Sequence, residues 1–274
     1  MAAPEEWVID EYSSNSQVCL AIEPDNHRAV EWSSVRVYHF TKAKWALQAI
    51  HNKRLRISRF FEMNDPFELF AVDQPDQGAR KGLREWSARV SEEQGVICFT
   101  GAWHDPLMWS NYGDRHGGVC LGFEVCDCDL EKINYSLQRL ASGPPQDLGH
   151  LLLTTKFSRW KYENELRVLA RLSEMIQKGE HYFKAFDNRL QLVEVIAGPR
   201  CCRGWQGPLA DVACGLPEKP KLIKARLSFR RFKVVTQLWH GSAAQGYDRD
   251  SLWQECRCHP RDHDAGENSK LLSA

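Results

Sequence analysis

The stretch 95–125, GVICFTGAWHDPLMWSNYGDRHGGVCLGFEV, decides the fold that we expect for this chain. It begins with an apolar run at 96–99 and ends with a second run at 119–123, and both are typical of buried strands. Between the two runs, Asp105 can cap a helix whose first position suits Pro106. The stretch therefore predicts a strand, a short helix over 105–115 and a second strand.

The side chains of the expected helix are unusual for a helix that only fills a core. They include Trp109, Ser110, Tyr112 and Asp114, and His116 follows just past the helix end. Flat rings and hydrogen-bonding groups of this kind suit the binding of a planar ligand.

Composition excludes several classes of protein. With 274 residues, of which 43% are hydrophobic, the chain can bury a substantial core. Lys plus Arg equals Asp plus Glu, at 36 each, so no strong overall field favours nucleic acid or membrane. No apolar run reaches the length of a membrane span and the first thirty residues do not resemble a signal peptide, so we expect a cytoplasmic protein without a membrane partner.

Ten cysteines raise the question of disulfides or a metal. In a cytoplasmic chain of this size free thiols are expected. The alternative is a zinc site built from His259 and the cysteines at 126, 128, 201, 202, 214, 256 and 258, but no pair has the two-residue spacing of a zinc knuckle or ribbon. We therefore expect no metal site. Gly-rich loops of the Rossmann and Walker types are also missing, which argues against hydride transfer and ATP hydrolysis.

The rest of the chain predicts an α+β domain over 35–240, preceded by an extension (1–34) and followed by a charged tail (241–274) that we expect to be partly disordered. A strand at 35–40, a helix opening at Thr41 and a strand at 55–60 form its first unit. In that helix Trp45, Leu47, Ala49 and Ile50 are expected to form the apolar face. A turn at 64–66 and an amphipathic segment at 78–94 lead into 95–125. A linker is expected at 126–150, then strands at 163–170, at 190–198 and within 225–238.

The strand at 163–170 carries the most notable charges. Period-two alternation places Glu163, Glu165 and Arg167 on one face, and Leu166 and Val168 on the other. Two carboxylates side by side would then meet a guanidinium.

The order of these blocks resembles the ADP-ribosyltransferase fold. YHFTKAKWALQAIHNKRLRIS, at 38–58, is similar to its first strand, helix and second strand, and GVICFT is similar to its Gly-Ile-Tyr-Phe-Ala strand. WSNY followed by GVCLGFEV resembles its Ser-x-x-Tyr helix and the next strand. ENELRVL, at 163–169, resembles the strand with the catalytic Glu. The resemblance implies a split β-sheet core with peripheral helices.

A closer resemblance is to a widespread bacterial family of unknown function. Its motifs are Asn-Asp-Pro-Phe-Glu, Met-Trp-Ser-x-Tyr-x-x-x-His-x-Gly and Lys-x-x-x-Trp-x-x-Glu-x-Glu-x-Arg, which match residues 64–68, 108–118 and 156–167. The family supplies no activity, so the expected function rests on the resemblance to the transferases.

That resemblance implies an enzyme that uses NAD as substrate and transfers ADP-ribose to a protein or nucleic-acid acceptor, or to water. Glu165 would be the catalytic carboxylate, His39 would bind the NAD ribose and Tyr112 would stack on nicotinamide. Further NAD contacts are implied at Tyr38, Phe40, Thr41, Asn64, Phe99, Trp109, Ser110, His116, Glu163 and Arg167.

The chain departs from the transferase pattern in two places. Ser110 and Tyr112 are two residues apart instead of three, and the Tyr of the Gly-Ile-Tyr strand is replaced by Cys98 or Phe99. The same residues also fit a structural interpretation, with His39 and Tyr112 in the core and the charges in solvent. A non-catalytic nucleotide- or partner-binding module, or a metal-dependent, nuclease-like toxin effector, remains an alternative.

Overall fold

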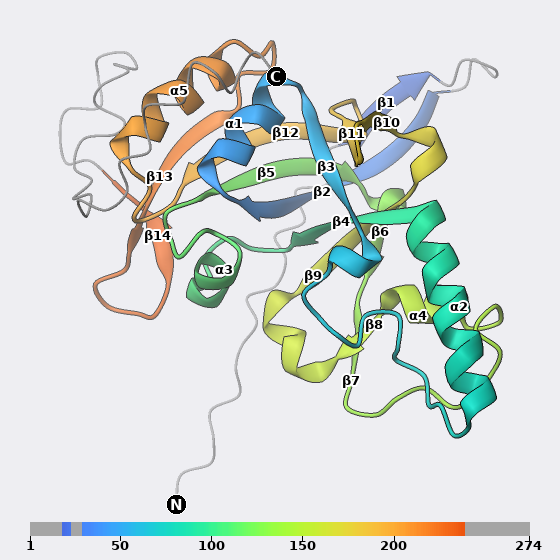
Figure 1. Cartoon of the computed structure of the whole chain (residues 1–274). Coiled ribbons are helices and arrows are strands. Elements are labelled where there is room, and N and C mark those ends of the chain that lie inside the picture. The colour runs from blue at the N-terminus through green and yellow to red at the C-terminus, as the bar shows by residue number, and fades with distance from the viewer. Residues whose placement is uncertain (1–17, 23–28, 239–274) are drawn as a thin grey trace, which may run out of the picture.

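A computed structural model describes residues 18–22 and 29–238 of the chain (Figure 1). It is an α+β structure in which one large, mostly antiparallel sheet is covered by a few helices. The tail expected at 241–274, and most of the extension expected at 1–34, lie outside the described residues.

Five α-helices, four 3₁₀ turns and fourteen strands are assigned within the described ranges. The helices are α1 (Ala43–His51), α2 (Gln77–Glu93), α3 (Pro106–Asn111), α4 (Gly149–Thr154) and α5 (Arg203–Cys214), and the 3₁₀ turns are η1 (Phe60–Glu62), η2 (Asp127–Asp129), η3 (Ser158–Glu163) and η4 (Leu172–Glu174). The strands are β1 (Val18–Ile22), β2 (Ala29–Thr41), β3 (Arg54–Arg59), β4 (Gln94–Thr100), β5 (Val119–Cys126), β6 (Leu130–Lys132), β7 (Asn134–Ser136), β8 (Thr155–Phe157), β9 (Glu165–Arg171), β10 (Ile176–Lys178), β11 (His181–Ala185), β12 (Leu190–Ala197), β13 (Lys221–Leu227) and β14 (Val234–Thr236).

The stretch 95–125 folds as its pattern predicts, into β4, α3 and β5. The Asp105 side chain caps α3 by accepting a hydrogen bond from the backbone N–H of Leu107 at 2.6 Å, and Pro106 takes the first helical position. The helix ends at Asn111, earlier than expected. The backbone of residues 114–116 takes positive φ angles that a helix cannot continue through.

Alternation along β5 shows why both faces of this part of the sheet are covered. Leu121 and Phe123 lie in a core shared with α1 and α5, whereas Cys120, between Val119 and Leu121, lies in a second core with Trp109 of α3. Figure 1 shows α1 and α5 together on one face of β5 and β12, with α3 on the other. A strand buried on both faces needs the continuous apolar run that predicted it.

The sheet divides into two halves that meet at a single residue pair. β2 continues into β5, β12, β13 and β14, while β4 continues into β3 on one side and β9 on the other. Between β2 and β4 only Tyr38 and Thr100 pair. Beyond that pair the two strands diverge, and the space between the halves is where side chains can line a cleft.

Several expectations about the elements are wrong in detail. Residues 126–150 are not only a linker: β6 pairs with β9, and β7 pairs in parallel with β8. The strand expected at 163–170 begins at Glu165, because Asn164 has a left-handed backbone (φ 43°) that ends η3. Trp45 is 48% exposed, because the buried face of α1 is formed by residues 43, 46, 47 and 50. Helix α5 was not expected, and β2 extends back past residue 35 to Ala29.

Candidate functional site

A cavity of about 250 Å³ opens where the two half-sheets diverge. Its walls come from β2, β3, η1 and the turn after it, β4, α3 with the residue at its end, β8, and the corner between η3 and β9. The lining residues are Tyr38, His39, Phe40, Arg56, Ser58, Glu62, Met63, Asn64, Val96, Ile97, Cys98, Phe99, Thr100, Met108, Tyr112, Lys156, Glu163 and Glu165. We call this cavity the cleft. It brings together the expected catalytic residues Glu165, His39 and Tyr112 and the expected contacts Tyr38, Phe40, Asn64, Phe99 and Glu163.

Lys156 joins the two carboxylates of the cleft. Its ammonium group donates to Glu163 Oε2 at 2.5 Å and to Glu165 Oε2 at 2.9 Å, and all three side chains are almost completely buried. The pair of carboxylates predicted from alternation is therefore real. Glu163 reaches it from the last residue of η3 instead of from the strand.

Arg167 lies outside the cleft and holds Glu165 in place through hydrogen bonds. Its Nε donates to Glu165 Oε1 at 2.7 Å, and its two terminal nitrogens form a bidentate pair with Glu68 at 2.6 and 3.0 Å. A further bond goes to the carbonyl of Leu153 at 2.7 Å. A fully buried guanidinium with these partners fixes the position of Glu165, while Leu166 lies in the core on the opposite face of β9, as alternation predicts.

The environments of the two carboxylates push their pKa values in opposite directions. Burial raises the pKa of Glu163 above its ordinary value and outweighs the ion pair with Lys156. Burial acts in the same direction on Glu165, but there Arg167 and Lys156 together outweigh it and lower the pKa. Glu165 therefore stays ionised while Glu163 is the more basic of the pair.

Tyr112 is held by its hydroxyl group. That group donates to Glu163 Oε1 and accepts from Asn64 Nδ2, the latter at 2.9 Å. Asn64 belongs to the expected turn, in which Asp65 Oδ1 accepts from the N–H of Phe67 at 2.9 Å. Because two hydrogen bonds hold its hydroxyl group, the half-buried ring of Tyr112 is pre-oriented in the wall of the cleft.

His39 is held by the neighbouring half-sheet. Its Nδ1 lies 3.0 Å from the carbonyl oxygen of Cys98, which can only accept, so Nδ1 carries the proton. Burial lowers the pKa of His39, so the ring is neutral near pH 7 and Nε2 is a hydrogen-bond acceptor.

Five expected contacts do not line the cleft. Trp109 is fully buried in the core under α3, where its Nε1 donates to Trp103 O at 2.6 Å, and Ser110 is exposed on the other side of that helix. Thr41 lies past the cleft at the end of β2, and His116 closes the left-handed turn after α3 through its backbone, which bonds to Trp109 and Arg200. Arg167 acts on the cleft only through Glu165.

Two residues of the charge network, Lys156 and Glu68, were not among the expected catalytic residues or NAD contacts. Both stand in the motifs that the chain shares with the bacterial family, at the start of Lys-x-x-x-Trp-x-x-Glu and at the end of Asn-Asp-Pro-Phe-Glu. These motifs were the feature of the sequence that could have identified Lys156 and Glu68 as site residues. Their spacing alone does not reveal that η3 folds the chain back so that Lys156 reaches Glu163.

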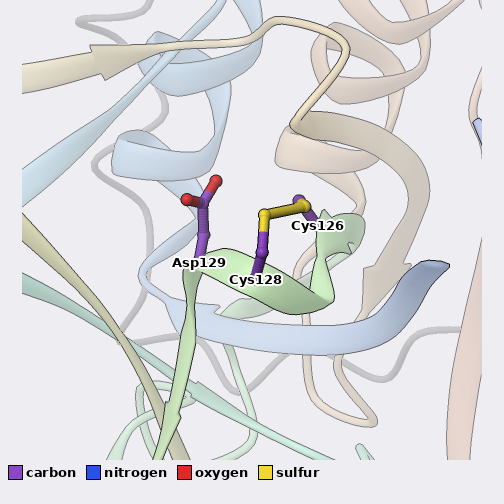
Figure 2. Close-up of side chains that lie close together, drawn as sticks. All are labelled: Cys126, Cys128 and Asp129. Carbon is purple, nitrogen blue, oxygen red and sulfur yellow. A yellow bond between two sulfur atoms is a disulfide. The ribbon is translucent and has the colours of Figure 1, made fainter. Parts of the chain in front are cut away.

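The expectation that all cysteines are free thiols is wrong for one pair. Cys126 and Cys128 form a disulfide, with Cα atoms 5.3 Å apart, because β5 turns into η2 between them. The sulfur atoms lie within 4.8 Å of a carboxylate oxygen of Asp129, a grouping that can hold a metal ion when the thiols are reduced (Figure 2). In the disulfide state both sulfurs are bonded to each other, and Arg189 pairs with Asp129. Cys256 and Cys258, which were considered as zinc ligands, lie outside the described residues.

Comparisons of the chain with family models, with curated proteins and with solved structures find no match. In the parts that the structure describes, no helix is both long and apolar enough to span a membrane.

Proposed function

We propose that this protein cleaves NAD in the cleft and transfers ADP-ribose to an acceptor or to water, with Glu165 as the essential carboxylate. The observation that carries the proposal is the pair Glu163 and Glu165: both face one cavity, both bind Lys156, and their pKa values are shifted apart. Pairs of this kind divide the work of charge stabilisation and proton transfer in glycosidic chemistry.

The reaction breaks the bond between C1′ of the ribose and the nicotinamide nitrogen, and the electron pair leaves with nicotinamide. Positive charge then develops on the ribose, and Glu165, which its lowered pKa keeps ionised near neutral pH, stabilises it. A hydroxyl group of the acceptor, or water, attacks C1′, and its proton passes to Glu163, the more basic carboxylate. The buried carboxylates of Glu68, Glu163 and Glu165 pair with the two cations Lys156 and Arg167. When all three carboxylates are ionised the network carries one net negative charge, which favours a cationic transition state.

Other cleft residues suit the two ends of the nicotinamide ribosyl group. Neutral His39 can accept a hydrogen bond from a ribose hydroxyl through Nε2, and the fixed ring of Tyr112 can stack on nicotinamide. Tyr38, Phe40 and Phe99 add flat apolar surface. The proposal includes the fold: a sheet whose halves share one residue pair above the cleft is what an ADP-ribosyltransferase-like split sheet would require.

The test is release of nicotinamide from NAD, measured by chromatography. We expect release by the wild-type chain and loss of at least about 100-fold in Glu165→Gln, the usual scale for removal of a stabilising group in the transition state. Glu124→Gln is the matched control, because Glu124 is also a buried carboxylate paired with an arginine, Arg36, but does not line the cleft. Thermal melts establish that each variant is folded. A folded wild-type chain that releases no nicotinamide, with or without cell extract as acceptor, contradicts the proposal.

One observation favours a non-catalytic binding module as the second candidate. Both oxygens of Glu165 already accept hydrogen bonds from cations, so its charge is partly neutralised before any ligand arrives. That candidate predicts calorimetric NAD binding without turnover, unchanged in Glu165→Gln. A metal-dependent, nuclease-like activity would be lost in EDTA, whereas nicotinamide release should survive it.

A further inference from the structure

A second pocket, of about 240 Å³, lies on the other side of β8 from the cleft. Thr155 and Phe157 line it, while the ammonium group of Lys156 between them points to the carboxylates of the cleft. Neighbouring residues of a strand point to opposite faces, so β8 separates the two cavities. The remaining walls are Phe67, Phe70, Ala71, Ser136, Leu137, Gln138 and Arg139, together with part of Lys156.

Three phenylalanine rings line this pocket, and two of them are exposed to solvent. Phe67 is 50% exposed and Phe157 is 42% exposed, and Phe70 adds a third ring. Large apolar groups gathered around one hollow mark a site for an apolar or flat ligand. The volume suits a single ring system.

The charge around the pocket favours an anion. The guanidinium of Arg139 lies 5.4 Å from the centre of the Phe67 ring, at the exposed rim. Among the described residues that line the pocket, none is acidic. A ring inside the pocket would therefore place an attached anionic group beside a cation.

A polar group inside the wall calls for a hydrogen-bond partner. Thr155 is 3% exposed, and its Oγ1 has no hydrogen-bond partner among the residues that the structure describes. An unpaired buried hydroxyl costs stability, and a ligand that inserts far enough into the wall to bring a polar edge atom to it would recover that cost. The neighbouring Thr154, equally buried, differs because its hydroxyl donates to the carbonyl of His150 at 2.8 Å.

We propose that this second pocket binds the base of a nucleotide, with the phosphate at Arg139. A nucleobase supplies a flat ring for the phenylalanines, polar edge atoms for Thr155 and an attached anion for the rim. The site is also tied to the cleft: Lys156 contributes to both, and the backbone N–H of Glu165 donates to the hydroxyl of Tyr135 on β7 at 2.8 Å. A ligand in the second pocket would therefore contact the same lysine side chain that pairs with the carboxylates of the cleft.

The first test measures binding of AMP, adenosine and ribose 5-phosphate to the full chain by titration calorimetry. We expect AMP to bind more tightly than adenosine, and ribose 5-phosphate not to bind. Phe157→Ala should weaken AMP binding roughly tenfold through loss of stacking. Arg139→Gln should reduce AMP affinity to that of adenosine and leave adenosine unchanged.

The paired threonines give the sharpest control. Thr155→Val should raise the melting temperature, because it removes an unpaired hydroxyl, and should weaken AMP binding. Thr154→Val should do the reverse, with a lower melting temperature and unchanged AMP binding. His39→Gln, in the cleft, should leave AMP affinity unchanged and so show which cavity is occupied.

A single-stranded oligonucleotide with a 5′-phosphate distinguishes the source of the base. Tighter binding of the oligonucleotide identifies a strand end as the ligand, and tighter binding of AMP identifies a free nucleotide; either supports the proposal. No binding of either at millimolar concentration, or AMP affinity that Thr155→Val and Phe157→Ala leave unchanged, overturns it. The readout is binding alone, so failure of NAD cleavage and failure of this site are separate results.

Discussion

At the scale of residues, Lys156 determines the electrostatics of the cleft because it is the cation that Glu163 and Glu165 share. Replacing it with methionine keeps most of the side chain's volume but leaves Glu163 without a cationic partner. We expect Lys156→Met to lower the free energy of unfolding by roughly 3–5 kcal/mol, the usual result of breaking a buried ion pair. Urea denaturation measures this loss. In Lys81→Met, which removes an exposed pair with Glu85, the loss should stay below about 1 kcal/mol; equal losses would contradict the role of Lys156.

Also at the residue scale, the hydroxyl of Tyr112 tunes Glu163. Its hydrogen bond lowers the pKa of Glu163 against the larger effect of burial, so Tyr112→Phe should raise that pKa further. If Glu163 accepts the proton in NAD cleavage, the acid limb of the pH–rate profile for nicotinamide release moves to higher pH, while the intact ring keeps NAD affinity within about twofold. Tyr182→Phe is the control, because Tyr182 lies on β11 and does not line the cleft. An unmoved acid limb would remove Glu163 from the proposed mechanism.

At the scale of elements, a close backbone approach sets the position of α3 and therefore of Tyr112 at its end. A Cβ on Gly118, in the turn that leads to β5, would lie 2.3 Å from the carbonyl oxygen of Thr41. Gly118→Ala should therefore lower the free energy of unfolding by about 1–3 kcal/mol, because rigid backbone must move. Gly82→Ala is the matched substitution: Gly82 lies inside α2 with open space around it, so alanine should stabilise by roughly 0.5–1 kcal/mol. Calorimetric melts of the two variants should shift in opposite directions.

At the scale of the whole molecule, the division of the sheet buries ionisable groups such as His39 between its halves. The free energy of unfolding therefore depends on pH. The folded-state pKa of His39 is lowered by burial, so as pH falls below 6.5 the unfolded chain takes up a proton that the folded chain does not. The stability present above pH 6.5 is therefore partly lost as the pH falls toward the lowered pKa of the folded state. We expect the free energy of unfolding to fall less steeply over this range in His39→Gln. His51→Gln, at the exposed end of α1, is the control for removing a histidine, and identical slopes in both variants and the wild type would contradict the assignment.

The sequence by itself determined the strand, helix and strand of 95–125, the cap at Asp105, and the common face of Glu165 and Arg167. These features follow from periodicity and capping, which are local. Only the tertiary structure decided that the sheet divides at Tyr38 and Thr100, that Lys156 bridges Glu163 and Glu165, and that Trp109 faces the core instead of the cleft. Those outcomes depend on contacts between segments that lie far apart along the chain, or on a single left-handed residue such as Asn164, and no pattern of spacing encodes them.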